Sequence, residues 1–339
     1  MATYGGPDIS TDDLALHLDA GSTKSHAGLG PELVTASEVT AIGDGHYVTI
    51  SNGGTTVFST GATLVANKTY QVSRRSLARR GTTSATFRIT LSGWSGSPNI
   101  NGTPGTTITS VTKPPSSGPL NVCTDNTGVD FDLEYLSVRE IDTTWYDLSG
   151  NGNHGTNIGM VYDIDRSPNF YFNGSNVSNI PNSPSLNPTT GLTIESWVKF
   201  DTNSADFIFE KGNVNTQYSL FSHGTDIMFR TFHAADSGYH NTSQAKTTIG
   251  VVNGQWHHIV GSWDGAVKRI FIDGLLKYSL NKSGALITRT TDAAVGRFGG
   301  TTSGYHFNGK IAKVAVYGRG LTADEIWRHF TALRGRFGV

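Results

Sequence analysis

GQWHHIVGSWDGAVKRIFIDGLLK, residues 254–277, is the most informative stretch of this sequence, because it predicts three β-strands and both turns between them. The dipeptides Asp264-Gly265 and Asp273-Gly274 tolerate the positive φ of tight hairpin turns, and each stands between aromatic or β-branched residues. This pattern predicts an antiparallel meander. Side chains in the middle strand alternate between two faces of unequal polarity, which is typical of one wall of a β-sandwich.

The same stretch resembles the Trp-His-His-Val…Trp-Asp-Gly signature of concanavalin A-like, laminin G-like jelly rolls. The turn, aromatic and histidine spacings all agree with that signature. The resemblance implies a lectin-type fold and by itself no activity. His257 and His258 are neighbours on a strand and point to opposite faces, so they cannot share one metal ion.

Composition points to an all-β protein and bounds its partners. The 339 residues leave room for two domains, and 41 glycines with short apolar runs predict many tight turns. A net charge of -1 gives no reason to expect nucleic acid or an anionic membrane as a partner. The single cysteine, Cys123, excludes an internal disulfide. No apolar stretch approaches the roughly 18 residues of a membrane span, so we expect no membrane insertion. Residues 1–10 have neither the basic nor the apolar region of a leader peptide, so we also expect synthesis in the cytoplasm.

Two phrases of the sequence belong together but lie far apart. LALHLD at residues 14–19 alternates as a strand should, and its natural sequel, TTWYDLSGNGNHGT, comes only at residues 143–156. In continuous form, this pair is similar to a segment of virion structural proteins of tailed phages, particularly phages of cyanobacteria. We therefore predict one jelly roll from residues 1–28 and 143–339, with residues 29–142 as an inserted domain. Insertion into a surface loop costs little when the inserted termini lie close together.

The insert itself has a β pattern. In VDFDLEYLSV, Val129, Phe131, Leu133 and Tyr135 alternate with acidic residues, which predicts an apolar inner face and an acidic outer face. The phrase Tyr-Leu-Ser-Val-Arg-Glu at residues 135–140 is similar to the last strand of carbohydrate-binding modules. The resemblance implies a second, compact β-sandwich.

The C-terminal region predicts an edge strand and then a helix. The strand within residues 306–321 should lie beside residues 14–19, as edge strands of jelly rolls do. Thr322 as N-cap with Glu325 forms a capping box, and Leu321 can staple Ile326.

One loop offers oxygen ligands at regular spacing. Asp147, Ser149, Asn151 and Asn153 stand two residues apart, so their side chains could converge on a calcium ion. Only one of them is a carboxylate, which favours the alternative of a Gly/Asn loop chosen for positive φ. Residues 150–155 also match the dinucleotide fingerprint, but neither a buried βαβ strand nor a helix adjoins them. We therefore expect no cofactor, and calcium at this loop is the one candidate.

Loop aromatics predict a shallow glycan site, because sugars stack on flat rings. The candidate side chains are Trp94, Tyr239, His240, Tyr305 and His306. The alternative role of these residues is in the rim of a subunit interface. A glycoside hydrolase of this fold needs paired carboxylates in an E-x-D-x-x-E run, and the sequence has no such run; Glu195 is a lone strand carboxylate.

The sequence thus supports a non-enzymatic virion protein, either a capsid decoration protein or a head fibre. One alternative is a tail fibre or receptor-binding protein that grips host surface polysaccharide, and another is a glycoside hydrolase. The expected partners are other virion proteins of the capsid or tail, further copies of the chain, and a host glycan. Tyr4, Pro7 and Ile9 could anchor an extended N-terminal arm in a partner's groove.

Overall fold

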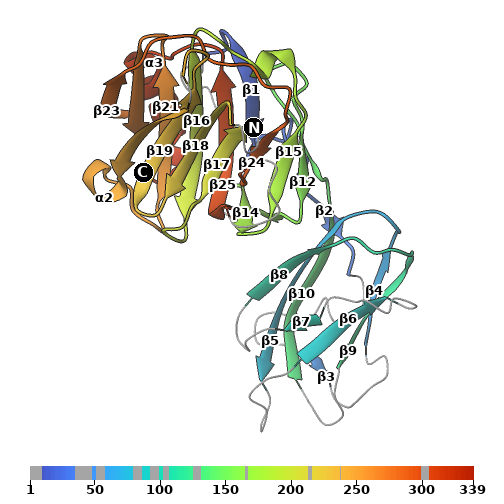
Figure 1. Cartoon of the computed structure of the whole chain (residues 1–339). Helices are drawn as coiled ribbons and strands as arrows, with labels where there is room; N and C mark the ends of the chain where they lie inside the picture. The colour runs from blue at the N-terminus through green and yellow to red at the C-terminus, as the bar shows by residue number, and fades with distance from the viewer. Residues whose placement is uncertain are drawn as a thin grey trace. The chain divides into compact units, whose positions relative to one another are not determined.

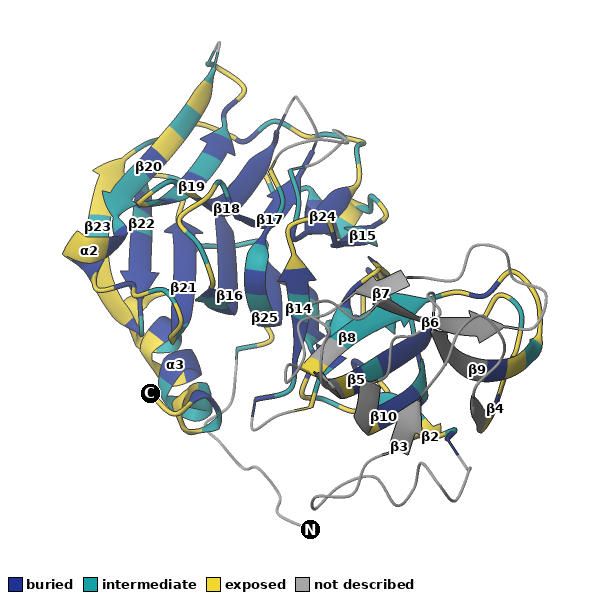
Figure 2. Ribbon diagram, turned by 90° about the horizontal axis from the view of Figure 1, so that it is seen from below, coloured by how far each residue is buried: buried dark blue, intermediate teal, exposed yellow. Residues whose placement is uncertain are grey.

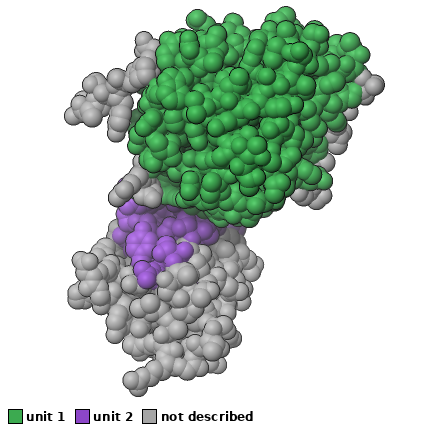
Figure 3. Space-filling view, turned by 90° about the vertical axis from the view of Figure 1, so that its left-hand side faces the viewer, with its two compact units in different colours: residues 1–27, 143–339 green, residues 28–142 purple. Residues whose placement is uncertain are grey.

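A computed structural model describes most of the chain. The described residues are 10–34, 48–50, 58–78, 86–91, 99–101, 107–124, 131–164, 167–212, 216–236, 238–298 and 305–339. Trp94 and the proposed arm residues Tyr4, Pro7 and Ile9 lie outside them. The chain divides into two compact units, which Figure 3 colours separately: unit 1 comprises residues 1–27 and 143–339, and unit 2 comprises residues 28–142.

Unit 1 consists of two antiparallel sheets that face each other (Figures 1 and 2). The back sheet has the order β13 (Val161–Asp163), β14 (Asn169–Asn173), β25 (Asn308–Tyr317), β16 (Leu192–Phe200), β21 (Trp256–Trp263), β22 (Val267–Ile272), β23 (Leu275–Asn281), with β1 (Leu14–Asp19) also paired to β25. The front sheet has the order β11 (Thr144–Trp145), β12 (Gly155–Ile158), β15 (Val177–Ile180), β24 (Ala293–Val295), β17 (Phe207–Lys211), β18 (Tyr218–His223), β19 (Asp226–Phe232), β20 (Tyr239–Ala245). Short helical turns η1 (Pro184–Leu186) and α2 (Lys246–Ile249) connect strands.

The core of unit 1 lies between the two sheets, which approach closely. A Cβ atom at Gly261 of β21 would come within 2.6 Å of the Phe229 ring on β19, so only glycine fits there. The predicted meander is confirmed: β21, β22 and β23 pair in sequence. Asp273, at φ 52°, and Gly274, at φ 77°, adopt the positive φ that the second turn requires.

The predicted edge pairing is also confirmed. Residues 14–19 form β1, which pairs antiparallel with β25, so that Leu18 lies opposite Val314. Leu16 and Leu18 are fully buried. The first described strand is therefore held by the last strand of the chain.

A C-terminal helix, α3 (Ala323–Phe337), covers the outer side of the back sheet (Figure 2). Its predicted capping box is present, since the Thr322 and Glu325 side chains each bind the other residue's backbone N–H. Phe330 and Phe337 stack on Trp197 of β16, with ring centroids 5.8 and 4.1 Å away. In the described part of the chain, no helix combines the length and the apolar character needed to cross a membrane.

Unit 2 also contains two antiparallel sheets, which confirms an all-β fold throughout. Their strands are β2 (Leu29–Glu32), β10 (Phe131–Ile141), β5 (Tyr70–Ala78), β8 (Thr107–Thr112) and β3 (Val48–Ile50) in one sheet, and β4 (Phe58–Leu64), β9 (Gly118–Thr124), β6 (Thr86–Leu91) and β7 (Asn99–Asn101) in the other.

One sequence prediction in β10 is wrong. The register against β5 shifts between Leu133 and Tyr135, which places Tyr135 on the outer face, where it is 44% exposed. Leu136 and Val138 are buried instead. A bulge adds one residue to the strand and exchanges its inner and outer faces beyond that point.

We predict that unit 1 folds without unit 2. The chain on both sides of unit 2 is already joined within unit 1, since Ser25 Oγ donates to Tyr146 O at 2.5 Å and Tyr146 N donates to Ser25 O at 2.6 Å. Deleting residues 30–141 and joining the ends with a short Gly/Ser linker should leave a β-rich protein that melts cooperatively.

The matched control also lacks residues 1–27, and should lose cooperative melting because it lacks β1. A protease-sensitive, non-cooperative product from the first deletion alone would show that unit 1 depends on unit 2. Melting followed by circular dichroism distinguishes the two results.

Candidate functional site

The outer face of the front sheet, which we call the front face, is identified by strand alternation. In β19, Ile227, Phe229 and Thr231 are fully buried, and Phe229 reaches β21 across the core. Arg230 must therefore point away from the core. Among the described elements, no helix covers this face, whereas α3 covers the back sheet (Figure 2).

A row of aromatic side chains and one arginine crosses the front face. The Arg230 guanidinium lies 4.9 Å from the Tyr239 ring centroid and 4.6 Å from that of Phe221. The Phe221 ring stacks on Phe207 at 4.4 Å, and Phe207 lies 6.3 Å from Tyr305. We call these five residues the aromatic row. It joins strands β20, β19, β18 and β17 to the segment that precedes β25.

Two of the predicted glycan-contact residues thus belong to the aromatic row. Tyr239 and Tyr305 lie at opposite ends of the aromatic row and are 40% and 46% exposed. Phe207 and Phe221, between them, are buried and provide a fixed apolar floor. Exposed rings above such a floor can stack on the apolar face of a sugar.

The other predicted glycan contacts do not join this row. His240 is opposite the fully buried Thr231, so its side chain lies on the other side of β20 from Tyr239. There the His240 Nε2 atom lies 2.8 Å from Asp236 Oδ2. His306 is half-buried, and burial, with a smaller effect from Arg297, lowers its pKa.

Some buried polar groups of the front face have no hydrogen-bond partner among the described residues. These are both side-chain amide atoms of Gln217 and the hydroxyl of Ser219, and both residues are fully buried. Ser219 is opposite Glu210 on one side and Arg230 on the other. Unpaired buried polar atoms cost about 1–3 kcal/mol each, and because both side chains are sealed from solvent, these atoms are not contacts for a ligand.

The Gly/Asn loop holds strand β1 in place. The Asp147 carboxylate accepts hydrogen bonds from the backbone N–H groups of His17, Ser149 and Asn153 at 2.8 to 2.9 Å. The Asn151 side-chain amide donates to Leu14 O at 2.8 Å, and that of Asn153 donates to Ala15 O at 2.7 Å.

These bonds favour the structural interpretation of the loop over calcium binding, because they occupy the Asp147 oxygens and turn the two amide groups towards β1. Ser149 Oγ likewise donates to Asp147, at 2.7 Å. In the described ranges, no three His, Cys, Asp or Glu side chains gather as they would around a metal ion.

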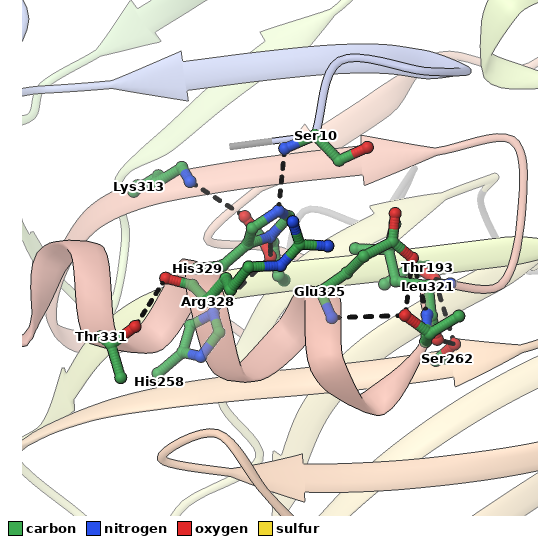
Figure 4. Close-up of polar contacts among 12 residues, drawn as sticks. Ser10, Thr193, His258, Ser262, Lys313, Leu321, Glu325, Arg328, His329 and Thr331 are labelled. Carbon is green, nitrogen blue, oxygen red and sulfur yellow. Dashed lines mark hydrogen bonds and ion pairs between the residues drawn. The ribbon is translucent and has the colours of Figure 1, made fainter. Parts of the chain in front are cut away.

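A second cluster of functional groups lies beneath α3 (Figure 4). Glu195 is 1% exposed; its carboxylate lies 2.9 Å from Lys313 Nζ and accepts a hydrogen bond from His329 Nδ1 at 2.8 Å. His258 Nε2 is 3.7 Å from the same carboxylate. The other ring nitrogen of His329 accepts from Ser10 N at 3.0 Å.

This cluster is sealed from solvent, so it cannot reach a substrate without loss of α3. Burial by itself would raise the pKa of Glu195, but the Lys313 ammonium and the two histidines hold that pKa well below its usual range. The Glu195 carboxylate therefore stays charged and anchors the helix.

Comparison with known proteins identifies the sandwich. Residues 172–327 match the family described as the Concanavalin A-like lectin/glucanases superfamily. Unit 1 therefore contains a concanavalin A-like, laminin G-like domain, as its sequence resemblance implied. A search of curated proteins found no match.

Solved structures show similarity at low identity. The botulinum neurotoxin type G receptor-binding domain is 16% identical, with 55% of this chain and 48% of that chain covered and a TM-score of 0.44. The binding domain of Paraclostridial Mosquitocidal Protein 1 is 15% identical, with the same shares covered and a TM-score of 0.44. The chain spans about half the length of these structures, and TM-scores below 0.5 imply nothing about what it binds.

We predict that E195Q destabilises the protein by about 3–5 kcal/mol, because it leaves the Lys313 ammonium buried without its counter-charge. The stabilising effect of the lowered Glu195 pKa is fully present above the ordinary glutamate pKa of 4.5 and is lost as the pH falls through the lower, folded-state pKa. E195Q should therefore also weaken the acid dependence of stability. Urea denaturation between pH 3 and 7 measures both effects.

The matched control is E140Q, since Glu140 pairs with Lys68 at the surface of unit 2, where the side chains are 43% and 48% exposed. An exposed pair contributes little to stability, because solvent screens the two charges. Equal, small effects of the two substitutions would contradict the anchoring role of Glu195.

Proposed function

We propose that the protein is a non-catalytic glycan-binding component of a tailed-phage virion, in which the front face of unit 1 holds the sugar. The observation that carries this proposal is the aromatic row. Tyr239 and Tyr305, from distant parts of the sequence, are exposed at the two ends of the row, and the rings of Phe207 and Phe221 between them are buried. A preformed aromatic surface binds sugars with little ordering cost.

The positions of the carboxylates on this face favour glycan binding over glycoside hydrolysis. The strands of the front sheet carry two carboxylates, Glu210 and Asp226. Glu210 lies opposite Ser219 and Asp226 opposite His223, four residues further along β18. At ~3.3 Å per residue they are separated by about 13 Å along the strands alone, more than the ~5–9.5 Å of glycosidase pairs.

The virion context is supported by the two separated phrases of the sequence. Residues 14–19 and 143–156 are hydrogen-bonded to each other, for example through Leu148 N to His17 O at 2.8 Å. They thus lie together in the fold, as the parts of one continuous segment would. We propose a capsid decoration protein or head fibre, and a receptor-binding tail fibre is the alternative.

Attachment to the particle is proposed through the N-terminal arm that contains Tyr4, Pro7 and Ile9. The described chain begins beside α3, where Ser10 N binds His329 and Ser10 Oγ accepts from Arg319 at 2.7 Å. An arm that precedes this anchor can extend to a neighbouring copy or to the shell beneath.

We predict that Y239A and Y305A each weaken binding to a polysaccharide ligand by about tenfold. The stacking of a nucleic-acid base on one aromatic side chain contributes about 1–3 kcal/mol, and we expect a sugar ring stacked on a tyrosine to contribute a similar amount. Glycan arrays and microcalorimetry measure the effect, and the same mixtures should release no reducing ends. W327A is the matched control, since Trp327 is 43% exposed on α3, away from the front face. If the protein released reducing ends and E210Q abolished that release, the front face would be a hydrolase site rather than a binding site.

We predict that removal of residues 2–9 leaves the melting temperature nearly unchanged and abolishes occupancy on particles. Gold labelling of intact particles measures occupancy and also locates the protein on the head or tail. If truncated protein still decorates particles fully, attachment lies elsewhere, with α3 as the next candidate. Label confined to the tail would favour the receptor-binding alternative.

A further inference from the structure

We propose that the front face selects acidic polysaccharides, whose sugars carry carboxylates, over neutral ones. This inference rests on the proposed glycan-binding function. It comes from three arginines, Arg230, Arg289 and Arg297, which lie along the aromatic row or beside it. Each of them holds its position through neutral groups rather than through a carboxylate.

Arg230 occupies the middle of the row. Its guanidinium lies between the rings of Phe221 and Tyr239, at 4.6 and 4.9 Å, and its Nε donates to Asn241 Oδ1 at 3.0 Å. Stacking and one bond to a neutral amide fix the guanidinium plane while leaving its terminal nitrogens available. Burial lowers the pKa of Arg230, which shows that the charge is held in a partly desolvated place.

The two other arginines flank the row. Arg289 lies 5.6 Å from the Phe232 ring, which in turn packs edge-on against Tyr239 at 5.5 Å. At the other end, Arg297 donates to Asn179 Oδ1 at 3.2 Å, beside Phe298. The Nε atoms of Arg289 and Arg297 have no hydrogen-bond partner within the described residues.

Three other arginines of unit 1 form ion pairs with carboxylates. Arg269 pairs with Asp264 at 2.6 Å, Arg319 with Glu325 at 2.6 Å, and Arg336 with Asp19 at 2.7 Å. The front-face arginines form no such ion pair with another described residue. A guanidinium without a counter-charge favours a carboxylate ligand, which it can bind through two parallel hydrogen bonds.

The acids of the same face do not neutralise these charges. Asp226 lies at the far end of β19 and accepts from Ser243 Oγ at 2.6 Å. Glu210 is buried and accepts from Thr216 Oγ1 at 2.5 Å, and it only partly offsets the effect of burial on Arg230. Neither carboxylate of the front-sheet strands forms an ion pair with Arg230.

The order of rings and guanidiniums on the front face suits a polymer with repeated negative charges. Aromatic rings that alternate with guanidiniums offer stacking surfaces for pyranose rings and partners for their carboxylates. The whole chain has a net charge of -1, so a general attraction for polyanions is not expected. Selection must come from this local arrangement.

The test compares a bacterial polyuronate with its carboxyl-reduced form, which keeps the linkages and loses the charges. Full-length protein should bind the polyuronate at least tenfold more tightly in 150 mM salt, and that ratio should shrink as salt rises. R230Q should reduce the ratio to near one. R230K should give an intermediate ratio, because lysine keeps the positive charge but lacks the planar guanidinium that binds a carboxylate through two hydrogen bonds. R328Q, on the exposed surface of α3, removes the same charge elsewhere and should keep the wild-type ratio.

Each other outcome contradicts a distinct statement. Equal binding to the two forms overturns acidic selection and leaves the proposed glycan-binding function intact. Binding to neither form across a panel of polyuronates overturns both. If a sulfated glycan without carboxylates, or single-stranded DNA, bound as tightly as the polyuronate, the protein would attract polyanions in general. That result would also overturn carboxylate selection. Melting temperatures of the variants exclude unfolding as the cause.

Discussion

The buried Glu195 carboxylate is the constraint on which the arrangement of unit 1 depends. A charge without solvent is tolerable only with counter-charges and hydrogen bonds around it. Lys313 from β25 and His329 from α3 supply these groups. The back sheet is thereby fixed to the helix on its outer side. That leaves the outer side of the front sheet, with its aromatic row, as the face that can meet a ligand.

Local patterns of the sequence predicted the fold well, because the forces that set them are local. Asp-Gly turns, strand alternation and the Thr322–Glu325 capping box each depend on a few neighbouring residues. The pairing of residues 14–19 with β25 was also predictable, from the edge rule for jelly rolls. The bulge before Tyr135 was not predictable, because the extra residue of a bulge has no distinct signal in the composition of the strand.

The candidate site was predicted only in part. Tyr239 and Tyr305 were identified as exposed aromatics, but adjacent residues on a strand point apart, so His240 could not accompany Tyr239. Arg230 was missed because DIMFRTF has bulky residues on both of its faces. Only contact with the opposite sheet shows which face is the core. The front-face arginines needed three-dimensional proximity to be recognised.

The pairing of β1 with β25 has a consequence for synthesis on the ribosome. At ~5–20 residues per second, about 15–60 s pass between the emergence of residue 19 and that of residue 308. During that time the apolar strand LALHLD lacks its final partner, while every described strand of unit 2 is translated. The nascent chain thus carries an unpaired, aggregation-prone edge until translation is nearly complete. Chaperones that shield nascent chains are most relevant to this protein during that interval.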